Sequence, residues 1–260
     1  LEGHDLQFAI YLMPLAVLGI LVGSAVAMFE RNIKRLLAYS SVENLGIIFI
    51  GLGLALVFLG TGHAPLGTLA FVAALYHVLN HALFKGLLFL SAGSVIHGVE
   101  HGHHHLHEGD HHGGDKFDPQ DMRTMGGLRH KMKTTFAVYM VGALALAGIF
   151  PLAGFWSKDE ILAHGAANGG TSFTVVYWLL TIAAFCTAFY MGRQVLMVFF
   201  GKPRHEAAEH AVESVPLMTT PLVILAALAA LAGILNFPFL SQAAAERAEE
   251  AHEFGNSLLL

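Results

Sequence analysis

The longest apolar run in this sequence is residues 66–97, LGTLAFVAALYHVLNHALFKGLLFLSAGSVIH, and it contains a lysine, Lys85. A membrane-spanning helix needs roughly 20 apolar residues. A cation near the bilayer centre costs about 2.5 to 3.5 kcal/mol and is retained mainly where it lines a polar pathway. The composition agrees with a membrane location, because 55% of the residues are hydrophobic, 13% are charged and the mean hydropathy is +0.60. The sequence therefore predicts an integral membrane protein with a functional lysine in its interior.

Working outward from this run, the other apolar runs that are long enough to cross a bilayer are residues 8–29, 36–59, 136–164, 172–200 and 217–236. Together they predict an all-α fold, a polytopic bundle of about six transmembrane helices. The third and fourth runs are longer than a straight helix needs, so each is expected to be tilted, kinked or broken. Pro151, with Gly148 and Gly154 beside it, predicts a broken helix in the fourth run. Lys158, the second lysine well inside an apolar run, follows this break.

Lysine and arginine residues alternate between the connecting segments. They occur in residues 31–35, 116–133 and 202–204, and they are missing from the two connections between these basic segments. Cytoplasmic loops carry the lysine and arginine excess, so the three basic segments are predicted to share the cytoplasmic side and both termini the other side. We expect a transmembrane domain over residues 1–240 with a histidine-rich loop at 97–118, and a polar tail at 241–260. The chain begins with Leu1, and we expect it to be a fragment of a longer protein.

His77, His81 and Lys85 follow one another at intervals of four residues. On a helix each step turns about 400° and rises about 6 Å, so the three side chains form one stripe. Imidazole titrates near neutrality and a desolvated lysine is shifted towards it, which suits proton transfer through intervening water. Two other interpretations stay open: hydrogen bonding between helices, and zinc ligation by the histidine pair.

Lys158 lies beside two carboxylates, Asp159 and Glu160, directly after the predicted break. Negative neighbours favour the protonated amine and desolvation disfavours it, so the group is a candidate for loading and releasing a proton. The alternative is a charge cluster at the membrane surface, where Lys158 extends to water. Glu43, about two turns into the second run, is either a further protonatable group or a near-surface partner of Lys34 or Arg35.

Other kinds of site have less support in the sequence. Residues 97–112 contain eight histidines among glycines and acids, but such tracts have no fixed ligand geometry, so we predict no metal site. The single cysteine, Cys186, lies in an apolar run and gives no basis for a disulfide or a cysteine-based metal or redox site. The sequence has no phosphate-binding glycine motif and no clustered basic and aromatic surface, so we predict neither nucleotide nor nucleic-acid binding.

Several motifs resemble one known family, the antiporter-like membrane subunits of proton-pumping NADH:quinone oxidoreductase, respiratory complex I, and within it subunit L or chain 5. The resemblance covers nearly the whole chain. It rests on Ile-Lys-Arg-Leu-Leu-Ala-Tyr-Ser-Ser at 33–41, the His77, His81 and Lys85 stripe, Asp-Met-Arg-Thr-Met-Gly-Gly-Leu at 121–128, Ala-Leu-Ala-Gly-Ile-Phe-Pro at 145–151 and Ser-Lys-Asp-Glu at 157–160.

This resemblance implies a set of roles. Lys34 matches the lysine at the cytoplasmic end of the family's second half-channel, and the stripe matches its central hydrophilic axis. Lys158, with Asp159 beside it, matches the lysine that passes the proton outward. The chain would then be one subunit of a translocase in a prokaryotic inner membrane, surrounded by lipid and other membrane subunits. It would hold no cofactor, since NADH, FMN, iron–sulfur clusters and quinone belong to partner subunits.

Two features point to neighbouring members of this class. Glu43 and Asn44, in place of the usual Ser-Gln, and the longer segment before His77 resemble the large membrane subunit of hydrogenase-4 and formate hydrogenlyase. A sodium or proton antiporter subunit of Mrp type is a further alternative. From another class of protein, a scaffold fragment whose ionisable groups only hold helices together remains open.

Overall fold

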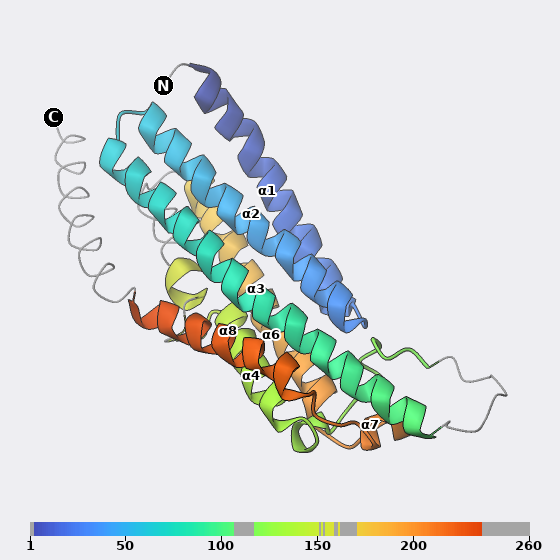
Figure 1. Ribbon diagram of the computed structural model, residues 1–260. Helices are drawn as coiled ribbons and strands as arrows, with labels where there is room; N and C mark the ends of the chain where they lie inside the picture. The colour runs from blue at the N-terminus through green and yellow to red at the C-terminus, as the bar shows by residue number, and fades with distance from the viewer. Residues whose placement is uncertain are drawn as a thin grey trace.

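The computed structural model describes residues 3–106, 117–150, 152, 154–158, 161 and 171–235 (Figure 1). Its elements in chain order are α1 (Gly3–Phe29), α2 (Ile33–Gly60), α3 (Ala64–Leu106), the short 3-10 helix η1 (Leu128–His130), α4 (Lys133–Ala147), α6 (Thr171–Phe199), α7 (Glu206–Glu209) and α8 (Pro216–Leu235). These residues form helices and connecting segments without a β-strand. The predicted all-α class is confirmed.

Five helices have the length and hydropathy to cross a membrane: Gln7–Phe29, Ile33–Gly60, Ala64–His104, Tyr177–Phe199 and Pro216–Gly233. The fourth apolar run is divided. Its first part, α4, has only 15 residues and ends at Gly148, whose φ of 72° is left-handed and favours glycine. The chain is helical again at residues 154–158. The predicted break is therefore present, although Pro151 itself lies outside the described residues.

The third run, which we expected to be tilted, kinked or broken, is not broken. α3 continues unbroken for 43 residues and extends past the end of α2 (Figure 1). The predicted start of the histidine-rich loop at residue 97 is therefore wrong, because the helix runs to Leu106. Two glycines lie in this extension. A Cβ on Gly98 would lie 2.5 Å from the Val212 carbonyl oxygen, and a Cβ on Gly102 would lie 2.4 Å from that of Ala207. These glycines let the last turns of α3 pack against the segment around α7. Residues 107–116 of the loop, and the tail at 241–260, lie outside the described residues.

The helices pack through close backbone approaches. α2 lies between α1 and α3, α6 packs against α1 and α4, and α8 against α3 and α4. A Cβ on Gly23 of α1 would lie 2.8 Å from both the Tyr39 carbonyl oxygen and the Glu43 backbone nitrogen of α2. Small residues permit such contacts in membranes, where packing rather than water exclusion drives helix association. Large apolar side chains cover the outside, among them Tyr11 and Leu217, which are 77% and 86% exposed.

The turn between α1 and α2 is joined to the segment that precedes η1. The Asn32 side chain caps α2 by accepting from the backbone N–H groups of its first turn, and its amide donates to Gln120 at 3.0 Å. Backbone bonds run from Ile33 N–H to the Gln120 carbonyl, 3.0 Å, and from Met122 N–H to the Arg31 carbonyl, 2.9 Å. Two of the three basic segments therefore meet at one end of the bundle.

Arg204 ties the third basic segment to the same end. Its Nη1 donates to the carbonyl oxygens of Met122, Met125 and Met197, at 3.3, 3.2 and 2.9 Å. The methionines at 122 and 125 are fully buried beneath it. The three basic segments thus lie at one end of the bundle, which is what their alternation along the sequence predicted.

Asp121 and Arg123 shape the connecting segment at this basic end. The Arg123 guanidinium donates to the Asp121 carboxylate, with Nη2 to Oδ2 at 2.6 Å. This hydrogen bond holds the pKa of the Asp121 carboxyl below its ordinary value, so the contact is ionised at neutral pH. Arg123 is exposed, so the pair fixes local geometry and adds little stability.

We predict that Gly23→Ala destabilises the protein, because the new methyl group meets rigid backbone of α2. Overpacking of this kind costs about 1 to 3 kcal/mol. Gly192→Ala in α6 is the matched control, since its Cβ would have no neighbour within 4 Å. The melting temperature of the purified membrane complex in detergent should fall for Gly23→Ala and stay level or rise for Gly192→Ala. Equal melting temperatures for the two variants would contradict the close packing of α1 on α2.

Candidate functional site

The predicted stripe on α3 is buried inside the bundle. His77 is fully buried, Lys85 is 5% exposed and His81 is partly buried. The rings of His77 and His81 have centroids 6.5 Å apart, and Phe84 packs against both. A direct N–H···N bond would bring the two centroids to about 5 Å. Proton transfer between these rings therefore requires a bridging water.

His77 connects the stripe to the helical segment after the break. Its Nδ1 lies 2.7 Å from the Ser157 hydroxyl, in the geometry of a hydrogen bond. Gly154 allows this segment to lie against the end of α4, because a Cβ there would be 1.7 Å from the Ala145 carbonyl oxygen. Ser157 and its neighbour Lys158 are thereby held beside α3, far from it in sequence but adjacent in space.

Lys158 occupies a position created by the end of α4. It is 5% exposed, and its Nζ donates to the Leu146 carbonyl oxygen at 2.9 Å. The last carbonyls of a helix have no intrahelical donor, and the partial negative charge there favours a cation. The broken helix thus exposes the acceptor that holds the lysine. The surface alternative for Lys158, a side chain extending to water, is wrong for this structure.

Lys85 binds α2 one turn before the position of Glu43. The Lys85 Nζ donates to the Leu37 carbonyl oxygen at 3.0 Å and to the Ser40 hydroxyl. Glu43, one turn further along α2, is fully buried. Its carboxylate accepts hydrogen bonds from the hydroxyls of Thr187 and Tyr190 on α6, the latter at 2.6 Å.

The interpretation of Glu43 as a near-surface partner of Lys34 or Arg35 is therefore wrong. Arg35 instead pairs with Glu30 at 3.3 Å, and Lys34 is exposed in the first turn of α2. Glu43 turns inward because its position on α2 faces α6, whose hydroxyls satisfy the carboxylate.

The buried cations are held by neutral acceptors. Glu43 lies within Coulombic range of both Lys85 and Lys158. Within the described residues neither lysine forms an ion pair with a carboxylate. A direct carboxylate contact would stabilise the protonated amine strongly. The nearest described acceptors of the two amines are instead carbonyl and hydroxyl oxygens.

The remaining predicted groups are placed as follows. Lys34 lies at the basic end, apart from the buried row formed by His77, His81, Lys85 and Lys158. Asp159 and Glu160 lie outside the described residues. In the part of the chain that the structure describes, no three His, Cys, Asp or Glu side chains are grouped as metal ligands.

Sequence reasoning missed the polar face of α6. Thr187, Tyr190 and Gln194 recur at i, i+3 and i+7 in an otherwise apolar run, which places them on one face of a helix. The Gln194 amide donates to the Ile33 carbonyl at 3.2 Å, and Arg193 donates to that of Glu30 at 2.8 Å. This spacing was the signal that α6 turns a polar face toward α2.

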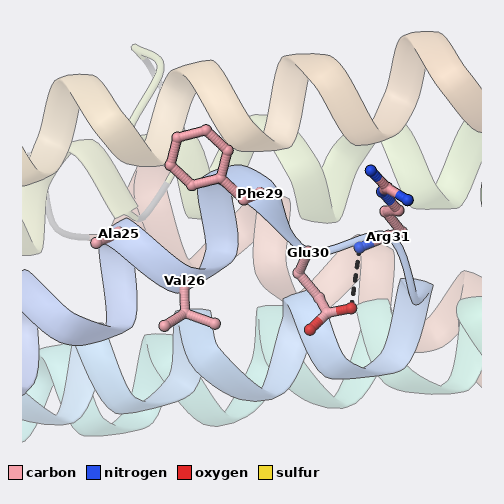
Figure 2. Close-up of a pocket in the computed structure, with 5 residues that line it drawn as sticks. All are labelled: Ala25, Val26, Phe29, Glu30 and Arg31. Carbon is pink, nitrogen blue, oxygen red and sulfur yellow. Dashed lines mark hydrogen bonds between the residues drawn. The ribbon is translucent and has the colours of Figure 1, made fainter.

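An open cavity lies at the basic end of α1, away from the buried row. Its volume is about 460 Å³, and Ala25, Val26, Phe29, Glu30 and Arg31 line it. Figure 2 shows the Glu30 carboxylate curling back to accept from the Arg31 backbone N–H, at 2.9 Å. None of the buried ionisable groups lines this cavity, so it takes no part in the site.

Comparison with known proteins identifies the family. Residues 3–189 match the transmembrane family described as NADH:quinone oxidoreductase/Mrp antiporter. The chain belongs to this family. It is accordingly an integral membrane protein, and its bacterial relatives indicate the inner membrane.

Three curated relatives show the range of similarity. The chain is 36% identical to NADH-quinone oxidoreductase subunit L of Rickettsia felis, over 85% of this chain and 29% of that protein. It is 35% identical to subunit L of Campylobacter jejuni, over 87% of this chain and 33% of that protein. It is 34% identical to NAD(P)H-quinone oxidoreductase chain 5 of a Picosynechococcus species, over 92% and 36%. The chain thus spans about a third of the length of these relatives.

A solved structure shares the fold. It is a chain of the membrane-bound sulfane sulfur reductase, an archaeal respiratory membrane complex, with a TM-score of 0.67 and 31% identity. The match covers 88% of this chain and 32% of that one. The family match and the curated relatives support the resemblance drawn from the motifs.

We predict that Lys158→Ala abolishes or strongly reduces ion translocation while the complex still assembles. The change removes an ionisable group without adding bulk. It also leaves the Leu146 carbonyl without its hydrogen-bond donor, which costs about 1 to 3 kcal/mol of stability. Pumping by reconstituted vesicles, measured by dye quenching and normalised to assembled complex, tests this. Normal pumping by the assembled variant would rule out Lys158 as a transfer group.

Proposed function

We propose that this chain forms the second half-channel of a proton-translocating membrane subunit of NADH:quinone oxidoreductase. Protons move along His77, His81, Lys85 and Lys158, and Glu43 supplies the buried counter-charge. The observation that carries the proposal is the buried row itself, formed by separate elements inside a bundle of membrane-crossing helices. Ionisable groups at such depth are costly and mark ion pathways.

The mechanism follows from what each group can hold. Either lysine can carry a proton while its acceptors, the Leu37 and Leu146 carbonyls, keep the ammonium solvated. The imidazoles accept at one nitrogen and donate at the other, which passes charge between the lysines through water. Because the protonated forms repel one another, loading one end of the row favours release from the other.

Energy enters from outside the chain. We propose that NADH, FMN, iron–sulfur clusters and quinone are held by partner subunits, and that this chain carries no redox centre. It would then act as the translocating part of the enzyme, with other membrane subunits and lipid as its surroundings. Lys34 at the basic end, with Asp159 and Glu160 after Lys158, would stand at the two ends of the half-channel.

A second candidate is the membrane subunit of a hydrogenase-4-type complex. The buried Glu43 and its neighbour Asn44 favour it, since these residues replace the usual Ser-Gln of subunit L. An Mrp-type sodium or proton antiporter is the third, because the family's description includes these antiporters. Replacing sodium by potassium in a vesicle transport assay separates a sodium carrier from a proton carrier.

In a scaffold Lys85 would only provide a positive charge, whereas in a relay it must also release a proton. We predict that Lys85→Arg impairs pumping nearly as much as Lys85→Ala, because guanidinium stays protonated at any workable pH and cannot release a proton. The number of protons pumped per electron, measured for the two variants at equal amounts of assembled complex, distinguishes a relay from a scaffold. Near-normal pumping by the arginine variant would show that Lys85 serves only as a structural charge, and it would contradict the proposed relay.

A further inference from the structure

Ser40 of α2 donates a hydrogen bond to one neighbour and accepts one from another. The residue is fully buried, and its hydroxyl donates to the Leu37 carbonyl oxygen of its own helix at 2.9 Å. A hydroxyl has a single hydrogen to donate, so the Ser40 oxygen offers only lone pairs to its second neighbour. That neighbour is Lys85 of α3, whose Nζ donates to it.

The Leu37 carbonyl completes the contact with the lysine. Lys85 Nζ donates to the Leu37 oxygen at 3.0 Å as well as to the Ser40 oxygen. The amine therefore faces two oxygens of α2, and both present lone pairs to it. Because Lys85 is only 5% exposed, water has little access to replace either acceptor.

We propose that Ser40 is a positioning residue that sets the pH at which Lys85 takes up its proton. The proposal rests on the function proposed above, because Lys85 must load and release a proton in that mechanism. A hydrogen bond from a charged ammonium is stronger than one from a neutral amine. An oxygen that presents only lone pairs therefore stabilises the loaded form of Lys85 relative to the empty form.

The other ionisable groups around Lys85 act on it at a distance. Glu43 of α2 and Lys158 after the break lie within Coulombic range of Lys85, and His81 lies one turn before it on α3. From α6, the Tyr190 hydroxyl is bound to Glu43. These groups are unchanged when only the serine is altered, so a change in the loading pH can be assigned to the lost contact.

Ser41, the next residue of α2, isolates the contact with the lysine. Its hydroxyl also donates to the Leu37 carbonyl oxygen, at 3.1 Å. Within the described residues, the hydrogen bonds of Lys85 Nζ go to Leu37 and Ser40. Removing either hydroxyl takes a donor from the same carbonyl, but only Ser40→Ala also takes an acceptor from Lys85.

We predict that Ser40→Ala moves the alkaline limb of the pH profile of proton translocation to lower pH, by about one to two pH units. This range corresponds to the loss of one hydrogen bond to a charged group. Without Ser40 the lysine holds its proton less tightly, so loading fails at a lower pH, and the rate recovers on further acidification. Ser41→Ala should keep the parent profile. The rates are measured by dye quenching across a buffered pH series, in vesicles that contain the full complex, and are normalised to assembled protein.

Two further variants make the test independent of how well Ser40→Ala assembles. Ser40→Thr retains the hydroxyl and should restore the parent profile. Ser40→Cys is close to serine in volume but has a weakly accepting sulfur, so it should shift the profile in the same direction as alanine. A packing defect would instead lower the rate at every pH and leave the limb in place, and that result would overturn the proposal.

The outcomes distinguish this inference from the proposed function. Loss of pumping at every pH in Lys85→Ala, together with an unshifted profile in Ser40→Ala, would overturn the role of Ser40 and leave the relay standing. Normal pumping in Lys85→Ala would overturn the relay itself, and with it the loading step that Ser40 adjusts. Equal shifts in Ser40→Ala and Ser41→Ala would assign the effect to the Leu37 carbonyl and overturn the role of the contact between Ser40 and Lys85.

Discussion

Hydrocarbon offers no hydrogen bonds, so each polar group inside this bundle needs a partner within the protein or a water held by it. The position of nearly every functional side chain follows from that constraint. Lys85 donates to a carbonyl and a hydroxyl of α2, and Lys158 to a carbonyl of α4. His77 binds Ser157, and Glu43 binds two hydroxyls of α6. These bonds cross between elements, so satisfying the site also holds the helices together.

The same constraint gives the broken helix its role. A continuous helix would satisfy its own carbonyls and offer nothing to a lysine. By ending α4 at Gly148, the chain exposes the Leu146 carbonyl, which then holds the Lys158 ammonium. Gly154 brings the following segment close enough for this contact. The break therefore provides the acceptor for the buried lysine and is not only a consequence of excess length.

The basic end shows how the water-facing side is organised. Arg204 donates to backbone carbonyls from two segments, and Asn32 both caps α2 and contacts Gln120. The Asp-Met-Arg motif that resembles subunit L lies in this junction, where Met122 is buried and Asp121 binds Arg123. These motif residues act structurally, joining the basic segments into one surface, while the buried row lies deeper in the bundle.

The sequence by itself determined the membrane class, the runs that become helices, the break after α4, and the identity of His77, His81 and Lys85 as one stripe. These features follow from hydropathy and helical period, which are local properties. It did not determine what the last turns of α3 pack against, because the neighbours of Gly98 and Gly102 lie some hundred residues further along the chain.

Only the tertiary structure decided which group each ionisable side chain meets. Glu43 had two interpretations of equal standing, and the choice came from the hydroxyls of Thr187 and Tyr190, about 145 residues further along the chain. Ser157 and the Leu146 carbonyl became partners of His77 and Lys158 in the same way. Periodicity reports which side chains share a helix face. Which face of another helix they meet is set by packing between elements distant in sequence.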